Sequence, residues 1–377
     1  MVVRVGDTAT DSRRDPAIDY LRGFIIVLVI FVHAALAYTT FSRVDPVEYY
    51  RSTAPIVDEV RWPVLDLPVL FCDVFFMPLL FLVSGLFVAP SLDRRGAAGF
   101  AVARLARLGV PFAVGAAVLA PLTYYASYRA STAGTAGDFL GRFFTSDTWQ
   151  VGPPWFLWVL LAFSLLLATV SRTGGLPRFL RRSPRPVTVA VAMVASYVLV
   201  AVVVDPGWWI SIGPFDVQLP RVPLYLVAYV AGVAVGAEDR WRQPGWPSHW
   251  PVWLIVGIAA FVPYALLATR PALVPGVPGR AAAALAFAVC CAGTDLGLLG
   301  LFRQFVRRRV RLADSLSANS FGIYLLHYGV VVWLQYAMLN TGWPAWAKFA
   351  VVMSGALCGS WLLSSILRRF SFARRML

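Results

Sequence analysis

The sequence has little of the charge that most soluble proteins carry on their surface. Asp, Glu, Lys and Arg make up only 14% of its 377 residues, whereas 59% are hydrophobic and the mean hydropathy is +0.69. This composition excludes an ordinary soluble domain and is typical of a protein that crosses a membrane many times. A soluble chain of this length would form about two or three domains, but in a bilayer we expect one helical bundle.

Cysteine is also scarce, and its distribution excludes two further kinds of site. The four cysteines all lie in apolar runs: Cys72, Cys290, Cys291 and Cys358. Because there is no C-x-x-C pair and no paired histidine spacing, we expect neither a metal site nor a disulfide framework. The cysteines are predicted to be small buried hydrophobes. A G-x-S-x-G motif is missing as well, so a serine nucleophile of that type is excluded.

The net charge of +14 would suit a protein that binds nucleic acid, so the positions of the arginines decide between two interpretations. They lie between apolar runs, and more of them lie in the segments on the side of the N-terminus. That is the positive-inside distribution of a membrane protein. We therefore predict the lipid bilayer of the plasma membrane as a partner, and no nucleic acid.

Ten apolar runs are long enough to cross a bilayer as helices. They are predicted at 18–38, 67–89, 107–127, 152–171, 187–204, 219–237, 250–268, 281–301, 318–339 and 345–366.

The predicted fold is an all-α bundle of about ten transmembrane helices with both termini in the cytoplasm. Residues 1–16 form the N-terminal tail, 17–368 the membrane domain and 369–377 the C-terminal tail. We expect the first run to be retained, because charged and polar residues interrupt it as a signal peptide. The seventh run is the weakest, since Pro263 breaks it.

The first run carries two residues that are expensive in hydrocarbon, Arg22 and His33. Eleven positions at about 100° each come within about 20° of three whole turns, so both lie on one helix face, about 16 Å apart along the axis. With Arg22 near the cytoplasmic surface, His33 is expected near the midplane. Arg22 could simply snorkel and His33 could be a core histidine, but ionisable residues inside a membrane are candidates for function.

Three further residues in the apolar runs are candidates for the site. His327 follows its cytoplasmic entry by about as many residues as His33 follows its own, so the two imidazoles are expected at similar depth. It is either a wall of the same cavity or a hydrogen-bonded core histidine. Asp73 lies in the outer third of the second run, as a histidine partner or as a carboxylate wetted from outside. Ser84, next to Gly85, is expected at a close helix contact and is a candidate near the donor.

Two arginines at the cytoplasmic surface have the spacing of a phosphate site. Arg104 and Arg107 are three positions apart on one helix face, which suits charge-assisted bonds to phosphate groups. Positive-inside anchoring explains them only in part. On the opposite side the connections 41–66, 128–150, 205–218 and 269–280 could roof a site. A basic cytoplasmic mouth, a buried histidine and an outer vestibule together suit group transfer across a membrane.

Several blocks of the chain match one family in order and spacing. Ile18-Asp19-Tyr20-Leu21-Arg22, followed after ten residues by His33, resembles the Arg-x10-His signature of membrane acyltransferase family 3. Later blocks resemble that family too: FFMPLLFLVSG (75–85), RLARLGVP (104–111), PPWFL (153–157) and SANSFGIYLLH (317–327). The resemblance covers essentially the whole chain. It is nearest to the glucan biosynthesis protein C-like branch or to O-acyltransferases that modify sugars and antibiotics. In the former branch a histidine often stands where this chain has Pro153-Pro154.

The resemblance implies an O-acyltransferase. The donor would be acyl-CoA, with acetyl as the usual acyl group, and the acceptor would be a hydroxyl of a carbohydrate or related compound. His33 would be the catalytic residue and Arg22 its essential companion, with Asp73 and His327 nearby. Arg104, Arg107 and Ser84 would bind the donor. The histidine could act as a general base or could carry the acyl group covalently.

Other classes of function are consistent with parts of the sequence. A proton-coupled transporter of a small polar solute would also use an intramembrane histidine, but such folds often repeat broken helices in two halves, and no matching halves are found. A membrane scaffold would leave Arg22 and His33 unexplained. The sequence does not decide between a monomer and a homo-oligomer.

Overall fold

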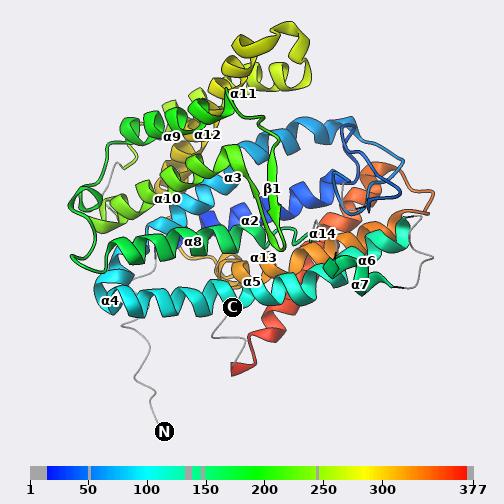
Figure 1. Ribbon diagram of the computed structural model, residues 1–377, viewed down its shortest axis with the longest axis horizontal. Coiled ribbons are helices and arrows are strands. Elements are labelled where there is room, and N and C mark those ends of the chain that lie inside the picture. The colour runs from blue at the N-terminus through cyan, green and yellow to red at the C-terminus, as the bar shows by residue number, and fades with distance from the viewer. Residues whose placement is uncertain (1–14, 50–51, 132–137, 146–148, 243–245, 372–377) are drawn as a thin grey trace.

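The computed structural model describes residues 15–49, 52–131, 138–145, 149–242 and 246–371. It is a bundle of helices that run mostly along one direction, with α2 near its centre (Figure 1). The helices are α2 (Pro16–Leu36), α3 (Asp66–Gly85), α4 (Val88–Arg104), α5 (Val110–Val114), α6 (Ala120–Ala130), α7 (Phe139–Thr145), α8 (Trp155–Val170), α9 (Pro186–Ala201), α10 (Val222–Ala237), α11 (Trp250–Thr269), α12 (Gly276–Phe305), α13 (Arg311–Met338) and α14 (Ala345–Leu367). The strands β1 (Trp209–Ile212) and β2 (Phe215–Gln218) form an antiparallel hairpin.

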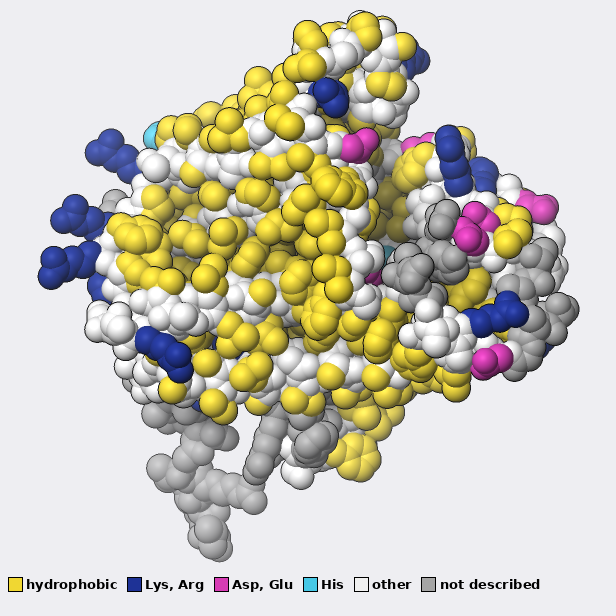
Figure 2. All heavy atoms as spheres, viewed as in Figure 1, with side chains coloured by type: hydrophobic (Ala, Val, Ile, Leu, Met, Phe, Trp, Pro, Cys, Tyr) yellow, Lys and Arg dark blue, Asp and Glu magenta, His cyan; other side chains and the backbone are white. Residues whose placement is uncertain are grey.

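The apolar helices confirm the all-α polytopic membrane class. In the described part of the chain, 8 helical segments are long and apolar enough to cross a membrane, and two more apolar helices, α8 and α9, are shorter. Together they overlap all ten predicted runs, and α11 continues through Pro263. Figure 2 shows hydrophobic side chains over the middle of the molecule and charged side chains toward its two ends. The exact number of spans and the side on which each terminus lies stay predictions.

The central helix α2 begins and ends at residues that supply its missing hydrogen bonds. Asp15 caps the N-terminus by accepting a bond from the Ala17 amide at 2.9 Å, and proline occupies the first position of the helix. At the other end, the Ser42 hydroxyl donates to the Leu36 carbonyl at 2.6 Å. The Thr40 amide and hydroxyl bond to Asp66, so the end of α2 is joined to the start of α3.

Glycines let α3 and α10 approach each other closely. A Cβ added at Gly85 would lie 2.3 Å from the Tyr229 carbonyl oxygen, and one added at Gly232 would lie 2.0 Å from the Leu82 carbonyl oxygen. Neither distance is compatible with a side chain, and small residues at such crossings are typical of membrane helices. The close helix contact predicted at Ser84-Gly85 is therefore confirmed.

The third predicted span is longer and less regular than the sequence indicated. Residues 88–130 are helical on both sides of a kink at Gly96, whose φ of 67° is not helical, and wide π-helical turns occupy Leu105–Gly109 and Gly115–Leu119. Pro111 and Pro121 follow these turns. Proline has no N–H, so it cannot donate the usual helical hydrogen bond to the carbonyl four residues earlier. In the widened turns, neighbouring N–H groups bond to carbonyls five residues earlier, so the backbone groups next to each proline keep hydrogen-bonding partners.

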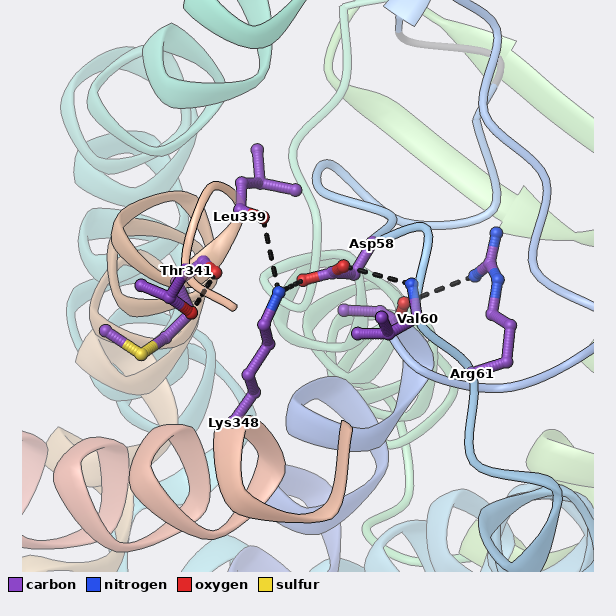
Figure 3. Close-up of polar contacts among 8 residues, drawn as sticks. Asp58, Val60, Arg61, Leu339, Thr341 and Lys348 are labelled. Atoms are coloured by element: carbon purple, nitrogen blue, oxygen red, sulfur yellow. Dashed lines mark hydrogen bonds and ion pairs between the residues drawn. The ribbon is translucent and has the colours of Figure 1, made fainter. Parts of the chain in front are cut away.

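The first outer connection is fastened to the bundle by a buried ion pair. Lys348, the only lysine of the chain, places Nζ 2.7 Å from Asp58 Oδ2, and the two side chains are 1% and 4% exposed. Figure 3 shows the two pointing at each other, with the Val60 amide donating to the other Asp58 oxygen. Arg61 donates to the backbone carbonyls that follow α2. The connection is thus held over the outer end of α2.

Removing one partner of this ion pair should destabilise the protein strongly. In Lys348→Met the Asp58 carboxylate stays buried without its cation, which costs about 3–5 kcal/mol of unfolding free energy. The double variant Lys348→Met/Asp58→Asn removes both charges and should recover most of that loss. Thermal unfolding of the purified protein in detergent measures both. Equal midpoints for the single and the double variant would contradict this role of the pair.

Candidate functional site

The hydrogen bonds of His33 determine which ring nitrogen can react. His33 lies in the last turn of α2 and is half-buried. Its Nδ1 is 2.8 Å from the Val29 carbonyl oxygen, and since a carbonyl only accepts, Nδ1 carries the proton. Nε2 therefore holds the lone pair. It has no hydrogen-bonding partner among the described residues and is not one of the fully buried unpartnered atoms, so it faces accessible space.

His327 lies beside this ring, as the residue counts predicted. It is fully buried in α13, and its Nδ1 donates to the Tyr324 carbonyl oxygen at 2.7 Å. Its Nε2 is 3.4 Å from His33 Nδ1, and the ring centroids are 5.2 Å apart. The similar depth of the two imidazoles is confirmed. Because the Nε2 lone pair of His327 faces the His33 N–H, His327 helps to hold His33 in one tautomer.

The helix that carries His33 ends slightly earlier than predicted. The sequence predicted a midplane position in a run ending at residue 38, but α2 ends at Leu36, one turn beyond His33. Relative to α2, His33 is thus close to one end, and its position near the bilayer midplane stays a prediction. The helix ends at Leu36 because the chain turns back there, with Thr39 and Ser42 bonding to the carbonyl of Leu36. Arg22 lies on the same face of this continuous helix, as expected.

Gln335 is a part of the site that the sequence reasoning missed. Its Nε2 donates to the carbonyl oxygens of His33 at 2.9 Å and Ala34 at 3.3 Å. These are orphan carbonyls of the last turn of α2, so one buried amide of α13 satisfies the helix end that carries His33. A signal was present, since Gln335 is polar within an apolar run and follows His327 by eight positions, close to the same helix face.

Five helices pack in a connected group that includes α2 and α13, which carry His33 and His327. α2 packs on α3 and α13, and α3 packs on α10. Trp155 of α8 contacts Tyr225 of α10 with ring centroids 5.6 Å apart, and Phe156 contacts Tyr324 of α13 at 6.0 Å. The Tyr324 hydroxyl also bonds to the Pro153 carbonyl. Figure 2 shows the surface hollowed between the hydrophobic body and the lobe of outer connections.

Asp73 has a different partner from the one considered. Both oxygens of Asp73 are held by Arg221, at 3.0 and 2.5 Å. No histidine bonds to it among the described residues. Its side chain is 41% exposed and that of Arg221 is 11% exposed, so Asp73 presents a fixed carboxylate to accessible space.

Arg221 could have been noticed in the sequence. It stands at the outer start of the run 219–237, where the positive-inside rule predicts few arginines. Its Nη1 also donates to the Asp73 backbone carbonyl at 3.1 Å, and its guanidinium lies over the Phe287 ring at 5.1 Å. The bidentate geometry fixes the Asp73 carboxylate in one orientation.

The predicted donor-site residues lie toward the other end of the bundle. Arg104 ends α4, is half-buried, and places its guanidinium 5.0 Å from the Phe100 ring centroid. Arg107 lies in the first wide turn and is exposed, so the two arginines differ in burial. α4, which ends at Arg104, packs on α10, and the backbone of Tyr229 in α10 lies against Gly85 beside Ser84. The helices that carry Arg104 and Ser84 thus both contact α10, and no hydrogen bond or ion pair in the described chain joins either residue to His33.

The outer connection 205–218 forms the hairpin of β1 and β2 and holds a buried acid. The Asp216 carbonyl accepts from the Trp158 indole at 3.0 Å, and its Oδ2 is 3.5 Å from the Val151 amide nitrogen. The side chain is 5% exposed, and burial raises the pKa of the Asp216 carboxyl. Its Oδ1 is fully buried without a partner. The hairpin therefore packs against the first turns of α8 and the residues just before it.

The described residues contain no group of three or more His, Cys, Asp or Glu that could hold a metal ion. Cys72, Cys290 and Cys291 are buried, as predicted. Cys358 is exposed on α14, so its predicted burial was wrong. An apolar run predicts burial in the membrane, but it does not distinguish a side chain that faces protein from one that faces lipid.

Comparison with known proteins agrees with the resemblance carried by the motifs. A family model described as an acyltransferase domain matches residues 15–365, which is nearly the whole chain. Neither the curated proteins nor the solved structures contain a match.

The buried carboxyl of Asp216 should make stability depend on pH. Its raised pKa means that the folded protein keeps this proton over a range in which the unfolded chain has lost it. Its contribution is fully present below the ordinary carboxyl pKa of about 4 and is lost as pH rises through the raised value. Relative to Asp216→Asn, the wild-type unfolding midpoint in detergent should therefore fall as the pH rises above about 4.

The exposed Asp205 on the same connection provides the control. Asp205→Asn should shift the midpoint by a small and nearly constant amount across that range. Parallel curves for wild type and Asp216→Asn would contradict the assignment to Asp216.

Proposed function

Because the chain belongs to membrane acyltransferase family 3, we propose that it transfers an acyl group from cytoplasmic acyl-CoA to a hydroxyl of a carbohydrate or related acceptor. Acetyl is the acyl group we propose. The family match identifies an acyltransferase over nearly the entire chain, so the transporter alternative is not favoured. The branch within the family stays a prediction.

The observation that carries the proposal is the accessible Nε2 of His33. A general base needs a lone pair within reach of the proton that it removes, together with a partner that holds the ring. Val29 and His327 hold the Nδ1 side, and Nε2 faces open space. The arrangement is that of an oriented base rather than a core histidine with both nitrogens engaged.

The reaction follows from this tautomer. Nε2 takes the proton of the acceptor hydroxyl, whose oxygen attacks the thioester carbonyl carbon. The carbon–sulfur bond then breaks, and the leaving thiolate takes the proton back from the imidazolium. While the ring is charged, the Val29 carbonyl 2.8 Å from Nδ1 stabilises it.

The two substrates would reach His33 from opposite ends of the bundle. Arg22 lies on the His33 face of α2, about 16 Å toward the end where the helices that carry Arg104 and Ser84 contact α10. Arginine is suited to the phosphates of the donor, and the extended acyl arm would run along this face. The acceptor would enter from the outer hollow, where the fixed carboxylate of Asp73 can accept hydrogen bonds from hydroxyl groups.

Substitution of the base should abolish transfer. In His33→Ala no lone pair remains at this position, and we expect the rate to fall at least about 100-fold. Arg22→Ala should be similarly damaging, whereas Arg178→Ala, at an exposed cytoplasmic arginine, should be mild. Transfer of labelled acetyl from acetyl-CoA to acceptors in a membrane extract, followed by mass spectrometry of the product, measures all three. Full activity of a well-folded His33→Ala protein would reject the proposal.

Substitution at the donor site should act on binding rather than on chemistry. Arg104→Ala removes one charged hydrogen-bonding group, which corresponds to about 1.5–3 kcal/mol and thus about a 10- to 100-fold rise in KM for acetyl-CoA. The kcat should change little, because the group is remote from His33. Arg178→Ala is again the control. A loss confined to kcat would show that Arg104 does not contact the donor.

A further inference from the structure

The acyl-transfer step develops a negative charge for which the proposed mechanism has not yet named a partner. When the acceptor oxygen adds to the thioester, the carbonyl oxygen becomes an oxyanion. Enzymes stabilise it with a preorganised hydrogen-bond donor, and loss of one such donor lowers kcat by about 10²–10³. The donors around His33 therefore decide where the oxyanion can lie.

Most donors near His33 are already engaged. The N–H of His327 donates a hydrogen bond to the Tyr324 carbonyl, and the Tyr324 hydroxyl donates one to the Pro153 carbonyl. The two amide hydrogens of Gln335 go to the last carbonyls of α2. These bonds fix the site but leave nothing to offer a substrate.

Tyr328 is the exception. Its ring meets that of His33 edge-on, with centroids 4.9 Å apart and an interplanar angle of 73°, and it is half-buried. Its ring centroid is 6.3 Å from that of Tyr124, and the two hydroxyl groups interact, with either one able to donate. When Tyr124 is the donor, the proton of Tyr328 is left for a substrate, and no other acceptor for it is found in the described chain.

The ring of Tyr328 is also held in place from behind. Gly152 has φ of 65° and lies against its edge, and a Cβ added there would be 2.6 Å from Cε1. Only glycine tolerates both this backbone conformation and this close approach. A donor whose orientation is fixed before the substrate binds needs little reorganisation during the reaction.

We propose that Tyr328 is a catalytic residue whose hydroxyl donates a hydrogen bond to the oxyanion of the tetrahedral intermediate, and that Tyr124 positions it. This inference rests on the proposed function. The acceptor proton goes to His33 Nε2, and the electron pair of the carbonyl bond goes to its oxygen beside Tyr328. Re-forming that bond expels the CoA thiolate, which takes the proton from His33.

The test is the kinetics of CoA thiol release from acetyl-CoA by the purified, reconstituted protein, with a membrane extract as the acceptor source. Tyr328→Phe keeps the ring and removes only the hydroxyl, so kcat should fall about 100-fold while KM for acetyl-CoA stays within about twofold. Tyr124→Phe should lower kcat about tenfold. The double variant should match Tyr328→Phe, since Tyr124 acts only through Tyr328. Tyr125→Phe, at the neighbouring exposed tyrosine, should match wild type.

The outcomes separate this inference from the function on which it rests. If His33→Ala abolishes thiol release but Tyr328→Phe keeps more than about a third of the wild-type kcat, the role of Tyr328 is overturned and the acyltransferase proposal stands. A loss through KM alone, or additive effects of the two tyrosine changes, would overturn it as well. If wild type and His33→Ala release no thiol, both proposals fail together.

Discussion

The hydrogen bond from His33 Nδ1 to the Val29 carbonyl, 2.8 Å long, is the interaction on which the site depends. It places the proton on one nitrogen and leaves the other free, and this choice gives the ring its chemistry. The bond is available because His33 is in the last turn of α2, where its own i−4 carbonyl can accept it. His327 supports the same tautomer with its lone pair on the other side of the N–H.

The surroundings of this bond follow from the cost of polar groups in an apolar bundle. An unpartnered buried polar group is destabilising by about 1–3 kcal/mol. Most polar side chains near His33 are therefore hydrogen-bonded to another group of the protein. Gln335 donates to carbonyls at the end of α2, and Tyr324 donates to a carbonyl of the loop before α8. Arg221 donates to the carboxylate of Asp73. The groups that we propose react are among the few that remain without a protein partner, as expected for a site that receives a substrate.

Positions along each helix could be predicted from the sequence. Counting residues from the cytoplasmic entries put His33 and His327 at one depth, and the small pair Ser84-Gly85 predicted the close contact of α3 with α10. Both hold because rise per residue and side-chain size are local properties. The end of α2 was predicted less accurately, because where a helix ends depends on caps supplied from the following loop, here Thr39 and Ser42.

What could not be predicted is which helices meet and which faces turn inward. The pairing of Asp73 with Arg221 joins residues 148 positions apart, and nothing in either segment identifies the other. The wide turns that separate Arg104 from Arg107 in burial and the hairpin that carries Asp216 likewise depend on contacts between distant segments. The exposure of Cys358 has the same cause.

The burial of Lys348 has a chemical consequence for the thioester donor that we propose. Activated acyl groups react with free amines as well as with hydroxyls, and a surface lysine near the donor would be acylated in a side reaction. Here the only ε-amine of the chain is 1% exposed and occupied by Asp58. The positive charges that we propose bind the donor are guanidinium groups, which remain protonated and are not nucleophiles. The chain thus offers the proposed donor cationic contacts without an accessible lysine side chain.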